Sequence, residues 1–103
     1  MEETVAQIIK DFALFGITIS FSGNVNDAYN EMLGQLSMQI ASLIMDDYSR
    51  LLSVLYQIDV SDREIQKSHL ELPDYTIAEI TSHQIIVREL KKVLTRRYFK
   101  SQT

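Results

Sequence analysis

The segment Leu51–Ile65, with the sequence LLSVLYQIDVSDREI, constrains the fold of this chain more than any other. Its apolar residues recur every three or four positions as far as Ile58, which is the period of an amphipathic helix with one buried face. Ser61 and Glu64 then form a capping-box motif, which marks the start of another helix. One helix therefore ends near Ile58 and the next begins after Ser61. So short a join predicts that the second helix folds back on the first.

The composition indicates one helical domain, 1–103. Hydrophobic residues make up 46% of the chain and charged residues 23%, which is typical of a globular protein. Cysteine is absent, which excludes disulfides and thiolate chemistry and fits a reducing cytoplasm. Two glutamates follow Met1, the wrong charge for a secretory signal, and no uncharged run reaches the ~20 residues of a membrane span. We therefore expect a cytoplasmic protein that does not associate with membranes.

The N-terminal part of the chain combines a helical pattern with a strand-like one. Residues 2–15 predict a helix that Gly16 ends. The next six residues alternate strictly between apolar and polar, although no other segment offers a strand for them to pair with. Either they form an extended connector packed on the helices, or they pair with the sheet edge of another chain. The apolar members are Ile17, Ile19 and Phe21. Asn26 is the expected N-cap of the helix that follows.

A long helical pattern runs from Asp27 to Ile58 without a Gly-Pro break. We expect one continuous or kinked helix, although Asp47 falls in the middle of its apolar face. Alternatively, Asp46 or Asp47 is an N-cap that starts a separate helix. The pattern does not decide between the two, because a cap of one residue leaves the helical phase nearly intact.

The C-terminal part predicts a short helix over residues 62–70 and a last helix from Ile77 to about Phe99. Thr76 and Glu79 form a second capping box before the last helix. Its expected buried stripe contains Ile80, Val87, Leu90, Leu94 and Tyr98, widened by Ile86 and Val93. The predicted fold class is all-α, a small bundle of four to five helices with two long antiparallel helices.

The sequence offers little catalytic chemistry. It has no phosphate-binding loop, no nucleophile elbow and no zinc-protease motif, so we expect no catalytic residue, no cofactor and no metal. Asp47 and His83 both fall on apolar helix faces. They are either two unrelated polar residues or a buried pair that fixes the register of the long helices. A catalytic dyad is the weakest interpretation, because no nucleophile lies near them in the sequence.

Charge is segregated along the chain. Residues 88–100 carry six bases and one acid, a local charge of +5, against −9 for the remainder. Arg88, Lys92 and Arg96 form a basic stripe at four-residue spacing. It can be a solvated face that complements the helix dipole, or it can bind an acidic partner or a second copy of the chain. Nucleic acid is a disfavoured partner because the isoelectric point is near 5.0.

The segments LLSVLYQIDVSDREI and QIIVRELKKVLTRRYF resemble uncharacterised small helical proteins of bacteria. The resemblance covers the C-terminal half and implies no activity. We expect a non-enzymatic helical protein-interaction module that associates with itself through Ile17, Ile19 and Phe21, tuned by the basic stripe. The alternatives are a binder of nucleic acid or of an acidic partner through the C-terminal helix, and a small enzyme that uses Asp47 and His83.

Overall fold

Five α-helices and one 3₁₀ turn form a single core in the computed structural model, which describes residues 1–101. The helices are α1 (Glu2–Ala13), α2 (Ala28–Asp46), α3 (Tyr48–Ile58), α4 (Asp62–Glu71) and α5 (Ile77–Ser101), and the 3₁₀ turn is Val25–Asp27. The described part of the chain contains no strand. The predicted all-α bundle is therefore confirmed.

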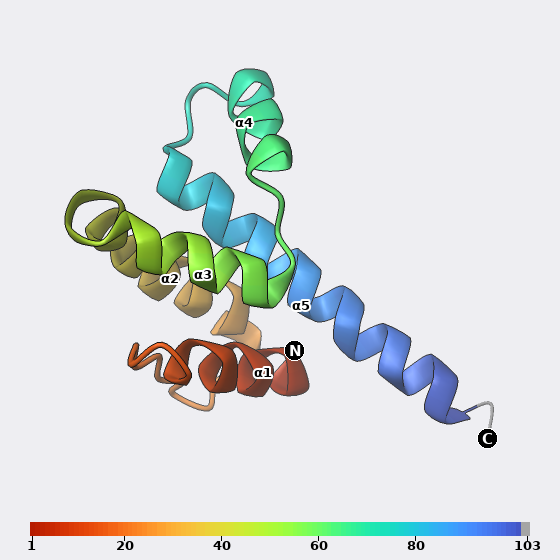
Figure 1. The fold of residues 1–103 in the computed structure, drawn as a ribbon. Coiled ribbons are helices and arrows are strands. Elements are labelled where there is room, and N and C mark those ends of the chain that lie inside the picture. Colours follow the sequence, from red (N-terminus) through yellow and green to blue (C-terminus); the bar gives the residue numbers. More distant parts are fainter. Residues whose placement is uncertain (102–103) are drawn as a thin grey trace.

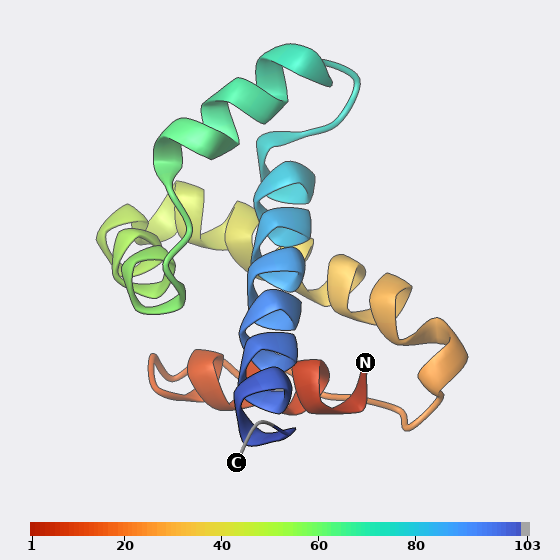
Figure 2. The same ribbon diagram turned by 90° about the vertical axis from the view of Figure 1, so that its right-hand side faces the viewer.

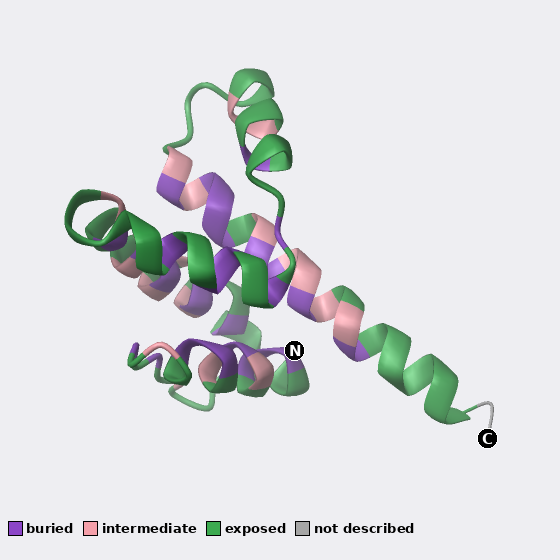
Figure 3. Ribbon diagram, in the orientation of Figure 1, coloured by how far each residue is buried: buried purple, intermediate pink, exposed green. Residues whose placement is uncertain are grey.

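Helix α5 is the element around which the others pack. It contacts α2 most extensively and also contacts α1, α3 and α4. The two longest helices, α2 and α5, run in broadly opposite directions but cross obliquely rather than lying side by side along their length (Figures 1 and 2). The buried residues face the crossing, whereas the last turns of α5 extend beyond the bundle and are exposed (Figure 3).

The strand-like segment is an extended connector within the chain. Ile17 and Ile19 are buried in the core, and Phe21 is half-buried against it. These side chains are already covered by the chain's own helices. The expectation that they provide a surface for another chain is therefore wrong.

Side chains of α2 form hydrogen bonds with the backbone of this connector, in the place of a neighbouring strand. The Gln35 amide accepts from the Ser20 N–H at 2.9 Å and donates to the Ser20 carbonyl at 2.6 Å. One turn earlier, the Glu31 carboxylate accepts from the Ser22 N–H at 2.8 Å and from its hydroxyl at 2.6 Å. Four helical residues rise ~6 Å and two extended residues ~6.6 Å, so the two repeats nearly match.

The long helical pattern is broken at Asp47, contrary to the continuous helix that we favoured. Asp47 leaves the helical conformation, with φ −156° and ψ 71°, and its carboxylate accepts from the Arg50 N–H at 3.2 Å. It thus caps α3, as the alternative interpretation had it. Leu43 and Leu51 on either side of the break are both buried, which shows why the apolar phase continues across it.

The corner after α3 forms as predicted, but α4 does not fold back on α3. Asp59 adopts a left-handed conformation, with φ 69°, and Val60 donates to the Leu55 carbonyl at 2.9 Å, which closes the end of the helix. The Ser61 hydroxyl accepts from the Glu64 N–H at 3.4 Å and begins α4. Helix α4 packs on α5 instead, with Ile65 as its buried residue.

Side-chain caps mark two other helix starts. Thr76 and Glu79 form both bonds of the predicted capping box, at 3.0 and 3.1 Å. The Asn26 cap is wrong, because it is Asn24 whose side chain accepts from the Asn26 N–H at the start of the 3₁₀ turn.

Candidate functional site

Helix α5 buries one face against the bundle, and this inner face differs from the stripe expected from the sequence. Its buried residues are Ala78, Ile80, Thr81, Ser82, Ile85, Ile86, Glu89 and Val93. The expected stripe was correct for Ile80, Ile86 and Val93 only. Val87, Leu94 and Tyr98 lie about 120–180° around the helix from Ser82 and Glu89, and Leu90 lies about 80–100° from them.

Those remaining members form an apolar row on the outward side of α5, which we call the outer stripe: Val87, Leu90, Leu94 and Tyr98. Val87 and Leu90 are half-buried, whereas Leu94 and Tyr98 are 52% and 61% exposed. The prediction that Leu94 and Tyr98 are buried is therefore wrong, because α5 is longer than the bundle that it packs against.

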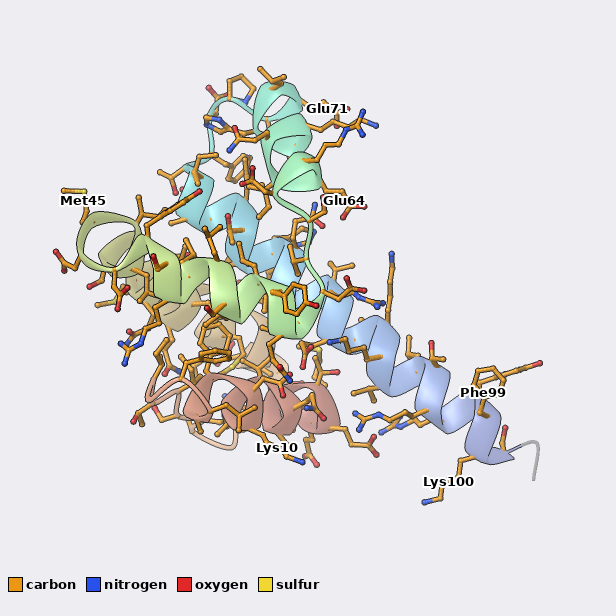
Figure 4. The ribbon with its side chains drawn as sticks, in the orientation of Figure 1. Lys10, Met45, Glu64, Glu71, Phe99 and Lys100 are labelled. Carbon is orange, nitrogen blue, oxygen red and sulfur yellow. The ribbon has the colours of Figure 1, made fainter. Side chains whose placement is uncertain are left out.

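The projecting end of α5 is exposed on every side. Residues 94–101 are all exposed, including Phe99 (Figure 4). Tyr98 and Phe99 contact each other edge to face, with ring centroids 5.5 Å apart. This end therefore presents apolar and aromatic side chains on a regular helix.

At its N-terminal end the outer stripe leads into a groove between α2, α4 and α5. The groove has a volume of about 410 Å³ and is lined mainly by Tyr29, Leu33, Leu72, Tyr75, Ile80 and His83. This volume is in the range of natural ligand sites. Ile80 lies seven residues before Val87 and His83 lies four residues before it, spacings that also separate members of the outer stripe. The groove and the stripe therefore form one continuous surface.

A few polar groups line this apolar groove. The Tyr29 hydroxyl lies 2.7 Å from His83 Nδ1, and the two rings meet edge to face. Gln84 Nε2 donates to the Ser68 hydroxyl at 3.1 Å, which ties α5 to α4. Hydrogen bonds from Thr76 hold the pKa of Glu79 below its ordinary value, so this rim residue carries a negative charge at neutral pH.

The proposed Asp47–His83 pair does not exist in this structure. Asp47 is exposed and caps α3, and His83 is exposed and contacts Tyr29. The helical phases placed both residues on apolar faces, but the break at Asp47 and the outward direction of His83 separate them. No dyad is formed.

The bases of the basic stripe are engaged with the chain itself. Arg88 forms an ion pair with Asp59 at 2.9 Å, and Arg96 donates to Gln7 Oε1 at 3.2 Å. Lys92 lies 3.2 Å from Glu89. The three bases line an open hollow of about 360 Å³ beside α1. They help to hold α5 to the bundle.

A buried polar cluster lies where α5 packs on α1. Glu89 is fully buried, and both its carboxyl oxygens are out of solvent. Burial and the neighbouring Asp11 carboxyl raise the pKa of Glu89 to about 7, an effect that Lys92 partly offsets. Gln7 Nε2 donates to Asp11 at 2.9 Å. The cluster can take up a proton near neutral pH.

The sequence interpretation missed Tyr29, Asp11 and Glu89 as parts of polar contacts. The signal for Glu89 was its spacing of four residues from both Ile85 and Val93, which places it on their face of the helix. No comparable signal pointed to Tyr29, because its contact with His83 joins residues 54 positions apart.

Two features are absent from the described residues. No group of three or more side chains there could hold a metal ion. Among the same residues, no helix is both long and apolar enough to cross a membrane.

No protein-family model matches the chain, and no significant match was found among curated proteins or solved structures. The function must therefore be inferred from the geometry of the chain itself.

Proposed function

We propose that the chain is a non-enzymatic helical module that binds another protein through the outer stripe and the adjoining groove. The observation that carries the proposal is that α5 leaves Leu94 and Tyr98 exposed, in a row with the half-buried Val87 and Leu90, while its opposite face already fills the core. The outward face of a surface helix is ordinarily polar. A contiguous apolar surface of this kind commonly marks an interaction site.

The form of the surface favours a macromolecular partner. Residues 94–101 project as a regular helix, and apolar residues spaced by three and four positions fit the groove or helix of another protein. Lys91 is exposed and lies within the stripe, four residues after Val87 and seven before Tyr98, so its charge favours an acidic partner.

The rival functions have less support. The two residues considered for catalysis lie apart, each with its own structural contact. A nucleic-acid interface needs available cations, whereas Arg88, Lys92 and Arg96 bind groups of this chain. Protein binding uses the surface that these contacts leave uncovered.

Site-specific photo-cross-linking tests the proposal. A photoreactive phenylalanine analogue replaces Tyr98 in chain expressed in the source cells, which are then irradiated. We expect a covalent adduct with a discrete protein, because Tyr98 lies on the proposed interface.

Gln66 is the control position, because it is exposed on α4 away from the outer stripe. An adduct at position 98 that is absent at position 66, and that Leu94→Glu abolishes, supports the proposal. A second variant carries the analogue at position 94 in place of Leu94. The proposal is contradicted if neither this variant nor the one at position 98 forms an adduct with any protein.

A further inference from the structure

We infer that the partner of the outer stripe is a second copy of this chain, whose α5 packs antiparallel against the first across a two-fold axis. The inference rests on the proposed function and identifies the partner. Each copy would place its projecting Tyr98 in the groove of the other.

The spacing along α5 supports pairing of helix with helix. Ile80, His83, Val87, Leu90 and Leu94 follow one another at intervals of three, four, three and four residues. This is the heptad spacing with which one helix packs along another. Along this seam Ile80 is buried at the bottom of the groove, Val87 and Leu90 are half-buried, and His83 and Leu94 are exposed.

The positions along this seam are self-complementary. With Val87 opposite Leu90 of the second copy, the axis passes between residues 88 and 89. His83 then faces the second copy's Leu94, and Ile80 lies beside its Arg97 and Tyr98. The groove and Tyr98 are thus about equally far from the axis, ~13 Å along α5 in opposite directions.

The groove suits the side chain that reaches it. It is lined by Tyr29, Leu33 and Leu72 over the floor formed by Ile80. An aromatic ring that enters it finds apolar walls, and its hydroxyl finds polar groups at His83 and Glu79. In the single chain Tyr98 is 61% exposed and fills no cavity of its own.

Charge favours the antiparallel over the parallel orientation. The end of α5 around Tyr98 carries Arg96, Arg97 and Lys100, and it stays net positive although Arg97 pairs with Glu3. The groove is bordered by acidic residues, with Glu79 in its lining and Asp74 beside Tyr75. Antiparallel pairing sets each basic end against an acidic rim, whereas parallel pairing sets the two basic ends against each other.

Two-fold symmetry also explains why a single apolar surface on each copy is enough to form a closed dimer. An isologous interface uses the same patch on both copies and closes after two chains. It covers Leu94 and Tyr98 of both copies at once. A head-to-tail contact would instead build an open row of copies, and the copy at the end of each row would keep an uncovered stripe.

Sedimentation velocity of the full chain up to about 100 μM tests the association, because a complex of micromolar Kd is well populated there. We expect a concentration-dependent dimer. Leu94→Glu should raise its Kd about thirtyfold, the effect of losing a central apolar contact. Leu70→Glu is the matched control, because Leu70 is 83% exposed on α4 outside the stripe. It should leave the Kd unchanged.

Single cysteines test the orientation, since the chain has none of its own. In the antiparallel dimer the two copies of residue 91 lie ~8 Å apart along the helices, and those of residue 101 lie ~38 Å apart. A short bis-maleimide should therefore join two copies of Lys91→Cys and fail to join two copies of Ser101→Cys. Circular dichroism checks that each variant keeps the helical content of the parent chain.

A chain that stays monomeric at ~100 μM overturns the inference, as does a dimer that Leu94→Glu leaves intact. Equal cross-linking at positions 91 and 101 overturns the antiparallel arrangement. None of these results removes the proposed function, which fails only if Tyr98 and Leu94 cross-link to no protein in cells. A Tyr98 adduct with a different protein, together with a monomeric chain, retains the function and rejects the second copy.

Discussion

Both faces of α5 mix apolar and polar residues. The inner face buries Thr81, Ser82 and Glu89 among its apolar residues, whereas the outer face exposes Leu94 and Tyr98. A helix at the surface of a bundle normally shows the reverse distribution. The difference teaches that burial on α5 is decided by which neighbours happen to cover it, and that the single chain leaves part of its apolar surface uncovered.

The largest expected effect separates the two faces by stability. Ile85→Ala, on the inner face, removes a fully buried side chain and should lower the free energy of unfolding by about 2–5 kcal/mol. Leu94→Ala, on the outer face, should change it by less than ~0.5 kcal/mol at low protein concentration. Urea denaturation followed by circular dichroism measures both, and equal losses would contradict the assignment of the faces.

The next effect concerns the carboxyl on the inner face. The pKa of Glu89 is raised from 4.5 to about 7 in the folded chain, so folding binds a proton between these values. The stability that this group confers is complete below about pH 4.5 and is lost as pH rises to about 7. At pH 8, Glu89→Gln should therefore raise the free energy of unfolding by up to ~3 kcal/mol relative to the parent chain.

Glu79 provides a control of opposite sign. Its pKa is lowered by hydrogen bonds from Thr76, so its contribution is present at neutral pH and is lost on acidification. Glu79→Gln should be less stable than the parent at neutral pH, and this deficit should disappear on acidification. Glu89→Gln should be more stable than the parent at pH 8, and this gain should disappear as pH falls below about 7. Denaturation curves at several pH values show both trends, and a Glu89→Gln difference that does not vary with pH would reject the buried, proton-binding carboxyl.

A smaller effect is expected in the groove on the outer side. Tyr29→Phe removes the hydroxyl that lies 2.7 Å from His83 but keeps the ring. The expected loss is about 0.5–1.5 kcal/mol, the net value of one hydrogen bond. Tyr75 lines the same groove, so Tyr75→Phe tests whether removing any tyrosine hydroxyl there lowers the stability by the same amount. Thermal denaturation of the two variants distinguishes these cases.

The smallest effect belongs to the projecting end. Arg97 and Glu3 form an exposed ion pair with a shortest distance of 2.8 Å, which links this end to α1. Exposed ion pairs contribute little to stability, so Arg97→Ala should barely alter it. A double-mutant cycle with Glu3→Ala isolates the interaction. A coupling clearly above the error of the measurement would mean that this end of α5 is held to the bundle more firmly than its exposure suggests.

The sequence predicted features that depend on neighbouring residues. The Thr76–Glu79 capping box forms both of its bonds, and the corner between Ile58 and Ser61 lies where the pattern placed it. These motifs are local, so their residues meet whatever the tertiary structure. The break at Asp47 was undecided because a cap of one residue preserves the helical phase.

The candidate site was harder to predict, because α5 is apolar on two sides. The pattern that includes Leu94 and Tyr98 is interrupted by His83 and Lys91, much as the true inner face is interrupted by Ser82 and Glu89. Only the positions of α1 and α2 decide which side is buried. Contacts such as Tyr29 with His83 depend on the same packing and cannot be read from spacing alone.

The match between α2 and the extended connector has a consequence for aggregation. Residues 17–22 are uncharged, lack proline and alternate like a strand, which are traits of segments that assemble into cross-β fibrils. Gln35 and Glu31 bind backbone groups that an incoming chain would use to extend such a fibril. The first turns of α2 thus act as a built-in gatekeeper. Fraying of these turns would expose the backbone groups of Ser20 and Ser22 that Gln35 and Glu31 now bind.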